Sequence, residues 1–96
     1  MTILVSCGPS MSEVAGTYSG SYTYNGNTFS VGIVLKEEGV YTKVTMKNGY
    51  NSSMEAGSIE IDGDEVVLHP SGNSGSSTRY TYSNGTLENN GHVFSK

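Results

Sequence analysis

The sequence predicts an all-β protein, an antiparallel meander of about eight short strands, and three observations support this fold class. Turn signals, most often Asn or Asp followed by Gly, recur about every 6–13 residues from residue 16 onward. Glycine after Asn or Asp tolerates the positive φ that a tight hairpin turn demands. Between the turns, apolar and polar residues alternate with the period of two that a strand exposed on one face shows. No helical period runs long enough to compete.

The turns divide the chain into eight expected strands. These occupy residues 16–24, 29–36, 40–47, 54–61, 65–69, 78–83, 86–89 and 92–96. In the lead-in before them, residues 12–15 are able to form one helical turn that Gly16 stops. Eight short strands joined by hairpins favour a closed up-and-down barrel, because closure removes exposed strand edges. A sandwich of two sheets is the alternative.

The alternation also predicts which side chains face the core. In the segment 29–36, for example, Phe29, Val31, Ile33 and Leu35 share one face. The same reasoning assigns Val44 and Met46, and not Tyr41, to the inner face of the segment 40–47. The side chains expected in one common core are Ile33, Leu35, Val44, Met46, Ile59, Ile61, Val66 and Leu68.

Length and composition limit the possible functions. A chain of 96 residues forms one domain, expected over residues 16–96. The net charge is −4 and the five basic residues are scattered, so no basic cluster exists to neutralise the phosphates of a nucleic acid. The single cysteine excludes an internal disulfide and a cysteine-rich zinc site.

The segment Leu4-Val5-Ser6-Cys7 fits the site at which bacterial lipoproteins are cleaved and lipidated. It has an apolar residue three positions before the cysteine and a small residue directly before it, and a small, polar stretch suited to a tether follows. We therefore expect residues 1–15 to be a signal remnant or tether outside the barrel, and Cys7 to carry the lipid. Met1–Val5 supply neither the basic nor the long apolar region of a signal peptide. The alternative is that Cys7 is an inert thiol.

The tyrosines are the candidate binding residues. Tyr18, Tyr22 and Tyr24 share one face of the first strand, and Tyr80 and Tyr82 share one face of a late strand. In a closed meander the first strand pairs with the last, which brings the two groups near each other. Tyrosine combines apolar area with a polar tip, as recognition surfaces require. The alternative is that these tyrosines fill a core that is poor in Leu and Phe.

Several segments together resemble the lipocalin-like barrels of bacterial envelope lipoproteins. Gly16-Thr17-Tyr18 matches the Gly-x-Trp or Gly-x-Tyr with which those domains begin. Two hairpins, "VGIVLKEEGVYTKVTM" and "IEIDGDEVVLHP", and the ending "YTYSNGTLENNGHVFSK" continue the likeness over residues 16–96. The resemblance implies a closed barrel that is lipid-anchored in the cell envelope or secreted. Copper-sensing relatives carry a Cys-x-x-Cys pair, which this sequence lacks, so we expect neither a metal nor another cofactor.

No catalytic residues are predicted, because no nucleophile and base can be paired from the sequence. We expect His69 and His92 to be exposed residues at strand ends. The expected function is a non-enzymatic binding or structural module whose partner is an unidentified protein or a small apolar ligand. Membrane contact is expected only through a lipid at Cys7. The alternatives are a carrier of a small apolar ligand and an inhibitor of a cell-wall hydrolase, the latter because "SGSSTRY" at 74–80 is similar to a stretch of small periplasmic lysozyme inhibitors.

Overall fold

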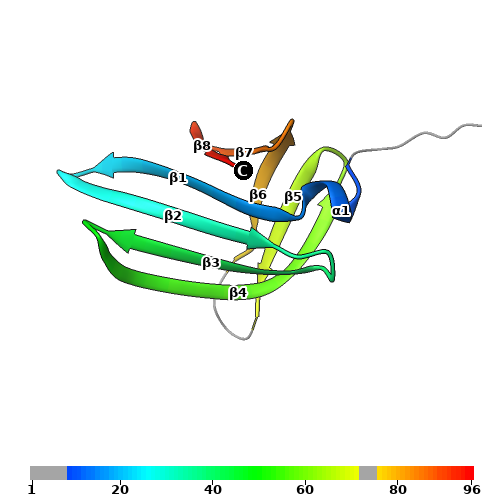
Figure 1. The fold of residues 1–96 in the computed structure, drawn as a ribbon, viewed down its shortest axis with the longest axis horizontal. Helices are drawn as coiled ribbons and strands as arrows, with labels where there is room; N and C mark the ends of the chain where they lie inside the picture. The colour runs from blue at the N-terminus through cyan, green and yellow to red at the C-terminus, as the bar shows by residue number, and fades with distance from the viewer. Residues whose placement is uncertain (1–8, 72–75) are drawn as a thin grey trace, which may run out of the picture.

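The computed structural model describes residues 9–71 and 76–96, so Cys7 and the tripeptide before it lie outside the described residues. One helical turn, α1 (Met11–Val14), precedes eight strands. The strands are β1 (Gly16–Tyr24), β2 (Asn27–Leu35), β3 (Val40–Lys47), β4 (Tyr50–Asp62), β5 (Glu65–Pro70), β6 (Thr78–Ser83), β7 (Thr86–Asn89) and β8 (His92–Ser95). Each strand pairs antiparallel with the next, and β1 pairs with β8 (Figure 1). The predicted all-β meander and its closure into a barrel are confirmed, and the fold is compatible with a lipocalin-like barrel.

The Asn-Gly dipeptides form the hairpin tips that the sequence indicates. Asn25, Asn48, Asn84 and Asn90 all have positive φ, between 49° and 52°, and each is followed by a glycine that also has positive φ. Two successive residues with positive φ define the turn whose twist matches that of paired strands. The turns between β1 and β2, β3 and β4, β6 and β7, and β7 and β8 are therefore dictated locally.

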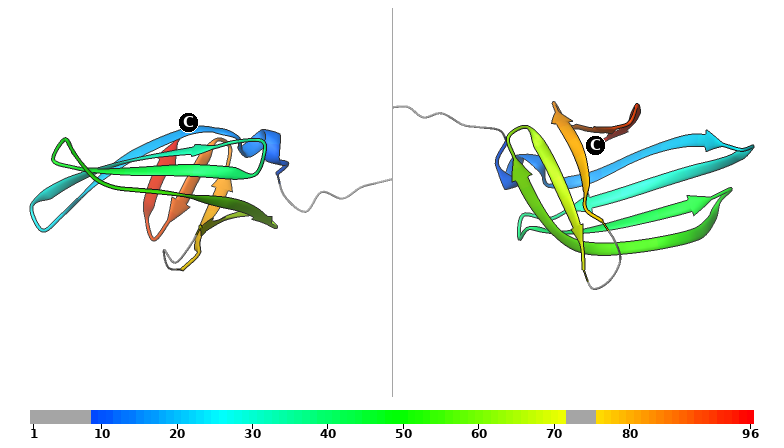
Figure 2. Two further views of the ribbon diagram at one scale, coloured as in Figure 1. Left: turned by 90° about the horizontal axis from the view of Figure 1, so that it is seen from below. Right: turned by 180° about the vertical axis from the view of Figure 1, so that it is seen from behind.

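The first four strands are longer than the last four and continue beyond the barrel (Figures 1 and 2). β4 pairs with β5 only from Gly57 onward, and β1 meets β8 at Ser19. Residues 20–31 and 43–55 therefore project from the barrel as two adjoining hairpins, here called the ribbon. The ribbon has an inner face that continues the wall of the barrel interior and an outer face that continues its exterior.

The predicted core is confirmed for most strands. Ile33, Leu35, Ile59, Val66 and Leu68 are buried in one cluster, and Ile61 packs against it while partly exposed. These side chains come from β2, β4 and β5, so the alternation identified the inner faces of those strands correctly. Burying such side chains contributes about 1.5–3 kcal/mol each relative to leaving them in water.

The predicted face of β3 is wrong. Ile33 lies opposite Lys43 and Leu35 lies opposite Tyr41, and directly paired residues of neighbouring strands share a face. Tyr41 therefore points into the core, where it is buried, and Val44 and Met46 lie on the outer face, half-buried. Both faces of β3 carry apolar or aromatic residues, so alternation alone could not fix its orientation.

α1 belongs to the packed structure. Val14 is fully buried in the core cluster and Met11 packs against that cluster. The Ser10 hydroxyl caps the turn by accepting a hydrogen bond from the Glu13 backbone N–H. The packed unit thus includes residues from Met11 onward, which lie within the segment expected to be a tether. No helix in the described part of the chain combines the length and the apolar character needed to cross a bilayer.

Candidate functional site

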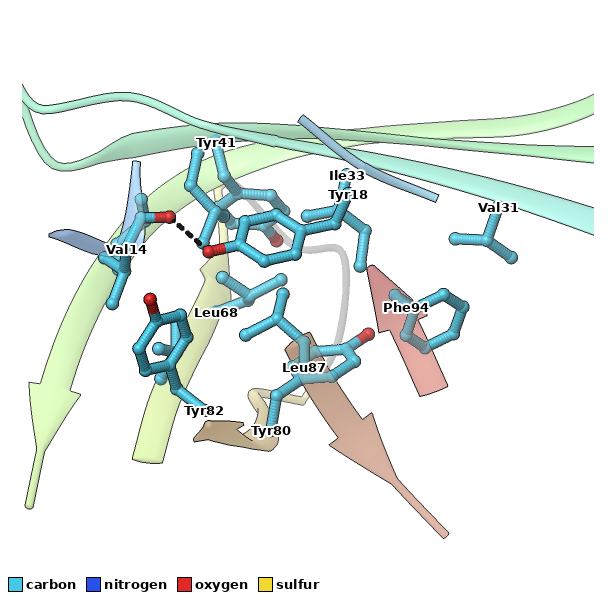
Figure 3. Close-up of a cluster of buried hydrophobic side chains, with 13 residues drawn as sticks. Val14, Tyr18, Val31, Ile33, Tyr41, Leu68, Tyr80, Tyr82, Leu87 and Phe94 are labelled. Atoms are coloured by element: carbon cyan, nitrogen blue, oxygen red, sulfur yellow. Dashed lines mark hydrogen bonds between the residues drawn. The ribbon is translucent and has the colours of Figure 1, made fainter. Parts of the chain in front are cut away.

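The five candidate tyrosines occupy three different environments. Tyr18, Tyr80 and Tyr82 are buried in the barrel interior together with Leu68 and Leu87 (Figure 3). For these three, the geometry agrees with the core-filling alternative. Tyr22 is half-buried where the ribbon leaves the barrel, and Tyr24 is exposed further along the ribbon. The structure therefore brings Tyr22, but not Tyr24, to the end of the barrel where Tyr80 also lies.

Tyr18 joins the interior to α1. Its hydroxyl donates a hydrogen bond of 2.7 Å to the carbonyl oxygen of Val14 (Figure 3). The ammonium of Lys96 lies 5.6 Å from the centre of the Tyr18 ring. Burial raises the pKa of Tyr18 well above its usual range, and the nearby Tyr82 and Glu13 raise it further. Tyr18 is therefore a neutral structural donor.

Tyr41 is a buried tyrosine that the sequence did not single out. Its hydroxyl donates a hydrogen bond of 2.5 Å to Oε2 of Glu55 on β4. Burial is the main reason that the pKa of Tyr41 is raised far above its usual range, and the bond to Glu55 adds to it. The signal was present in the sequence as a tyrosine alternating with Lys43 and Thr45, but that face had been assigned to solvent.

A cleft opens where the ribbon leaves the barrel. Its volume is about 180 Å³, and side chains from six strands line it. We call it the barrel mouth. It is formed by Tyr22, Val31, Lys43, Thr45, Thr78, Tyr80, Asn89, His92 and Phe94.

Aromatic rings form much of the wall of the barrel mouth. The rings of Tyr22 and His92 lie 4.5 Å apart between centres, and the Phe29 ring stacks on Tyr22 with its centre 5.2 Å away. Tyr80 and Phe94 meet edge to face at 6.0 Å. Aromatic pairs at these distances are worth about 0.5–1.5 kcal/mol beyond the area that they bury, so the wall is held in place before any ligand arrives.

Two polar groups in the barrel mouth have no partner among the described residues. Lys43 takes part in no ion pair or hydrogen bond there, although Glu55 lies directly across from it on β4. The Tyr80 hydroxyl likewise forms no hydrogen bond with that part of the chain. Asn89, by contrast, donates to the backbone oxygen of Arg79 at 2.9 Å. The cleft therefore combines aromatic surface with a cation and a hydroxyl that no other described residue engages.

A separate polar cluster lies on the outer face of the barrel. Nδ1 of His69 lies 2.5 Å from the Ser77 hydroxyl, and Nε2 lies 2.8 Å from Oε1 of Glu60. This is a nucleophile, base and carboxylate in contact, which the sequence did not reveal because Glu60 lies on β4, His69 on β5 and Ser77 directly before β6. The side chains of His69 and Glu60 are 41% and 59% exposed, so water surrounds the cluster. His92, at the start of β8, is exposed as expected.

Comparisons with known proteins identify no family: no family model matches the sequence, and no similar curated protein or solved structure is found.

Proposed function

We propose that this protein is a non-enzymatic binding module of the bacterial cell envelope and that the barrel mouth is its binding site. One observation carries the proposal. The paired rings of Tyr22 and His92 stand in one concave cleft beside the Lys43 ammonium and the Tyr80 hydroxyl, which have no partner among the described residues. Small-molecule sites have this character, with apolar and aromatic walls and a few convergent polar groups that fix orientation.

The rest of the barrel favours the mouth over other locations. The interior beyond the mouth is packed with buried side chains, including Tyr18, Ile33, Leu68 and Leu87. A small eight-stranded barrel is either filled in this way or holds one small ligand, so a ligand here is limited to the mouth. A wider hollow of about 460 Å³ lies on the outer face near Val44 and Met46, but no charged side chain lines it in the described structure.

The outer cluster supports an enzymatic function less well. Acyl transfer through Ser77 and His69 requires donors aimed at the developing oxyanion in a site from which water is excluded, because electrostatic stabilisation is far weaker in water. The high exposure of His69 and Glu60 opposes this. We assign the cluster to cross-strand hydrogen bonding on the barrel exterior.

Inhibition of a cell-wall hydrolase is also less well supported. The stretch that suggested it ends in Arg79 and Tyr80. The Arg79 guanidinium contacts Asp62 at 3.0 Å and Glu65 at 2.8 Å, both in its own chain, and Tyr80 is buried. The ion pairs engage Arg79, and burial withdraws Tyr80 from the surface that an inhibitor of this kind would present to its target.

The envelope location rests on the segment Leu4–Cys7 and on the resemblance over residues 16–96. Its test is expression from the natural gene in a bacterium fed an alkyne-tagged fatty acid. The protein should carry the tag and sediment with membranes, and Cys7→Ala should abolish both, because a lipoprotein anchor of several acyl chains holds firmly. An untagged wild-type protein would contradict this location.

Binding at the mouth is tested by nuclear magnetic resonance with a library of small ring compounds. Compounds that bind should shift amide signals of β1, β3 and β8. Tyr22→Ala should abolish these shifts because it removes the central ring of the stack. Tyr24→Ala is the matched control, since Tyr24 lies two residues along the same strand and is exposed. The site assignment fails if both variants bind as the wild type does.

A further inference from the structure

Lys43 and Tyr80 bring two hydrogen-bond donors to one small volume. Lys43 enters the barrel mouth from β3 and Tyr80 enters from β6. Tyr80 is only 3% exposed, yet its hydroxyl has no hydrogen-bond partner among the described residues. In that part of the chain no side-chain polar atom is both fully buried and unpartnered, so the hydroxyl keeps some exposed surface. A buried polar group without a protein partner is costly unless water or a ligand satisfies it.

The acidic residue across from Lys43 does not form an ion pair with it among the described residues. Glu55 lies across from Lys43 on the neighbouring strand, and its Oε2 accepts the hydrogen bond from Tyr41 instead of pairing with the Lys43 ammonium. The other titratable groups that line the mouth are Tyr22, Tyr80 and His92, and no acidic side chain is among the lining residues. The cleft of an otherwise acidic protein is therefore locally suited to an anion.

We propose that the barrel mouth binds a small aromatic carboxylate. The ring packs against Tyr22 and His92, and the carboxylate accepts hydrogen bonds from the ammonium of Lys43 and the hydroxyl of Tyr80. A carboxylate is matched to these two groups because an ionised carboxylate only accepts hydrogen bonds and the lysine only donates them. This inference rests on the proposed function and names the ligand class of that site.

The size of the cleft and the charge of its lining narrow the class of ligand further. The cleft of about 180 Å³ is smaller than the 300–1,000 Å³ typical of sites for drug-sized ligands, so one ring fills it. A phosphate carries a charge of about −1.5 to −2 and is usually held by arginine clusters or several backbone N–H groups, whereas this cleft offers one lysine. A single carboxylate on a single ring is the ligand that these dimensions favour.

The experiment compares benzoate with its neutral counterpart benzyl alcohol on the intact protein. Titrations followed by ¹H–¹⁵N spectra should give a benzoate-dependent shift of signals from β3, β6 and β8. We expect benzyl alcohol to bind about tenfold more weakly, the ratio that corresponds to the loss of one charge-assisted hydrogen bond. Benzoate binding should also weaken as salt increases, because a partly exposed ion pair is screened.

Two variants separate the contributions of Lys43 and Tyr80 to benzoate binding. Lys43→Met keeps an unbranched side chain without the ammonium and should weaken benzoate binding about tenfold while leaving benzyl alcohol binding unchanged. Lys36→Met is the matched control: Lys36 lies between β2 and β3, outside the mouth, and should have no effect beyond a small change in net charge. Tyr80→Phe keeps the ring and should weaken benzoate several-fold, whereas Tyr24→Phe should not. Spectra of the free variants establish that each is folded.

The outcomes distinguish this inference from the proposed function. Equal affinity for benzoate and benzyl alcohol, with both abolished by Tyr22→Ala, would preserve the binding site and overturn the carboxylate assignment. An unchanged benzoate affinity in Lys43→Met would also overturn it, as would the absence of benzoate shifts up to about 10 mM, a threshold equivalent to very weak binding. If instead no compound of the wider library depends on Tyr22, the proposed site itself fails.

Discussion

The Tyr18 hydroxyl donates a hydrogen bond of 2.7 Å to the carbonyl oxygen of Val14, and both residues are fully buried. The carbonyls at the end of a helical turn have no partner within it, so one from outside must satisfy them. Tyr18 does this from β1 and thereby fixes α1 against the end of the barrel. The first strand and the turn that precedes it are consequently one packed unit.

Replacing Tyr18 by Phe should destabilise the protein by about 1–3 kcal/mol, because it leaves the buried Val14 carbonyl without this donor. Urea denaturation followed by circular dichroism measures the change. Tyr24→Phe is the control, since Tyr24 is exposed and its replacement should change the free energy of unfolding very little. Equal stability of the two variants would show that water satisfies the carbonyl as well as Tyr18 does.

The protein should lose stability at alkaline pH. The pKa values of Tyr18 and Tyr41 are raised in the folded state relative to about 10 in the unfolded chain. Their stabilising contribution is therefore complete below pH 10 and declines as pH rises above it, where the unfolded state loses protons and the folded state retains them. Each tyrosine should contribute a slope of about 1.4 kcal/mol per pH unit in this range.

Denaturant midpoints measured between pH 8 and 12 test this dependence. Tyr41→Phe should be less stable than the wild type near neutral pH, because it leaves Glu55 without its partner, and it should show a shallower decline above pH 10. An equally steep decline in Tyr41→Phe would mean that Tyr41 ionises normally in the folded protein.

The face of β3 can be tested by comparing two deletions of apolar volume. Ile33→Ala removes a fully buried side chain and should cost about 2–5 kcal/mol, the usual range for such changes in a core. Val44→Ala, on the outer face, should cost clearly less because the side chain is half-buried. A cost for Val44→Ala that matches the cost for Ile33→Ala would restore the original assignment of this strand.

Two glycines within strands, Gly57 on β4 and Gly32 on β2, should respond oppositely to replacement by alanine. A Cβ at Gly57 would overlap the backbone carbonyl of His69, because β4 and β5 approach closely there. Gly57→Ala should therefore destabilise the protein by about 1–3 kcal/mol or more. At Gly32 no heavy atom of the described residues, apart from its chain neighbours, lies within 4 Å of the added carbon, and Gly32→Ala should stabilise β2 by about 0.5–1 kcal/mol. Thermal unfolding of both variants gives the comparison, and a harmless Gly57→Ala would show that the strands separate easily at this point.

The sequence predicted the structure correctly where a local pattern is compatible with only one conformation or one face of a strand. The Asn-Gly dipeptides placed the hairpin tips, and strict alternation placed Ile33, Leu35 and Leu68 in the core. On β3 both faces carried apolar or aromatic residues, and only the register with β2 decides between them. Which face of β3 is buried depends on its pairing with another strand, and the alternation within β3 itself does not reveal this.

The candidate site was predictable only in part. Tyr22 and Tyr80 were selected as tyrosines, and closure of the barrel did bring their strands toward one cleft. Lys43 and His92 were not selected, because their role depends on the departure of the ribbon from the barrel. That departure follows from the unequal lengths of β4 and β5, and a pattern of turns gives strand positions without showing where pairing stops.

Because β8 pairs with β1, the eight strands form a closed ring in which the first and last strands are neighbours. Gly16 lies beside the side chain of Lys96, whose ammonium also donates to the Glu13 carbonyl, so the two ends of the packed unit meet. The point at which the polypeptide begins is then a property of the gene and not of the architecture. A short linker from Lys96 to Met11, with new termini opened at the exposed tip between Asn48 and Gly49, would preserve every strand pairing. In such a permuted chain each strand would keep its two neighbours, although the chain would begin at Gly49.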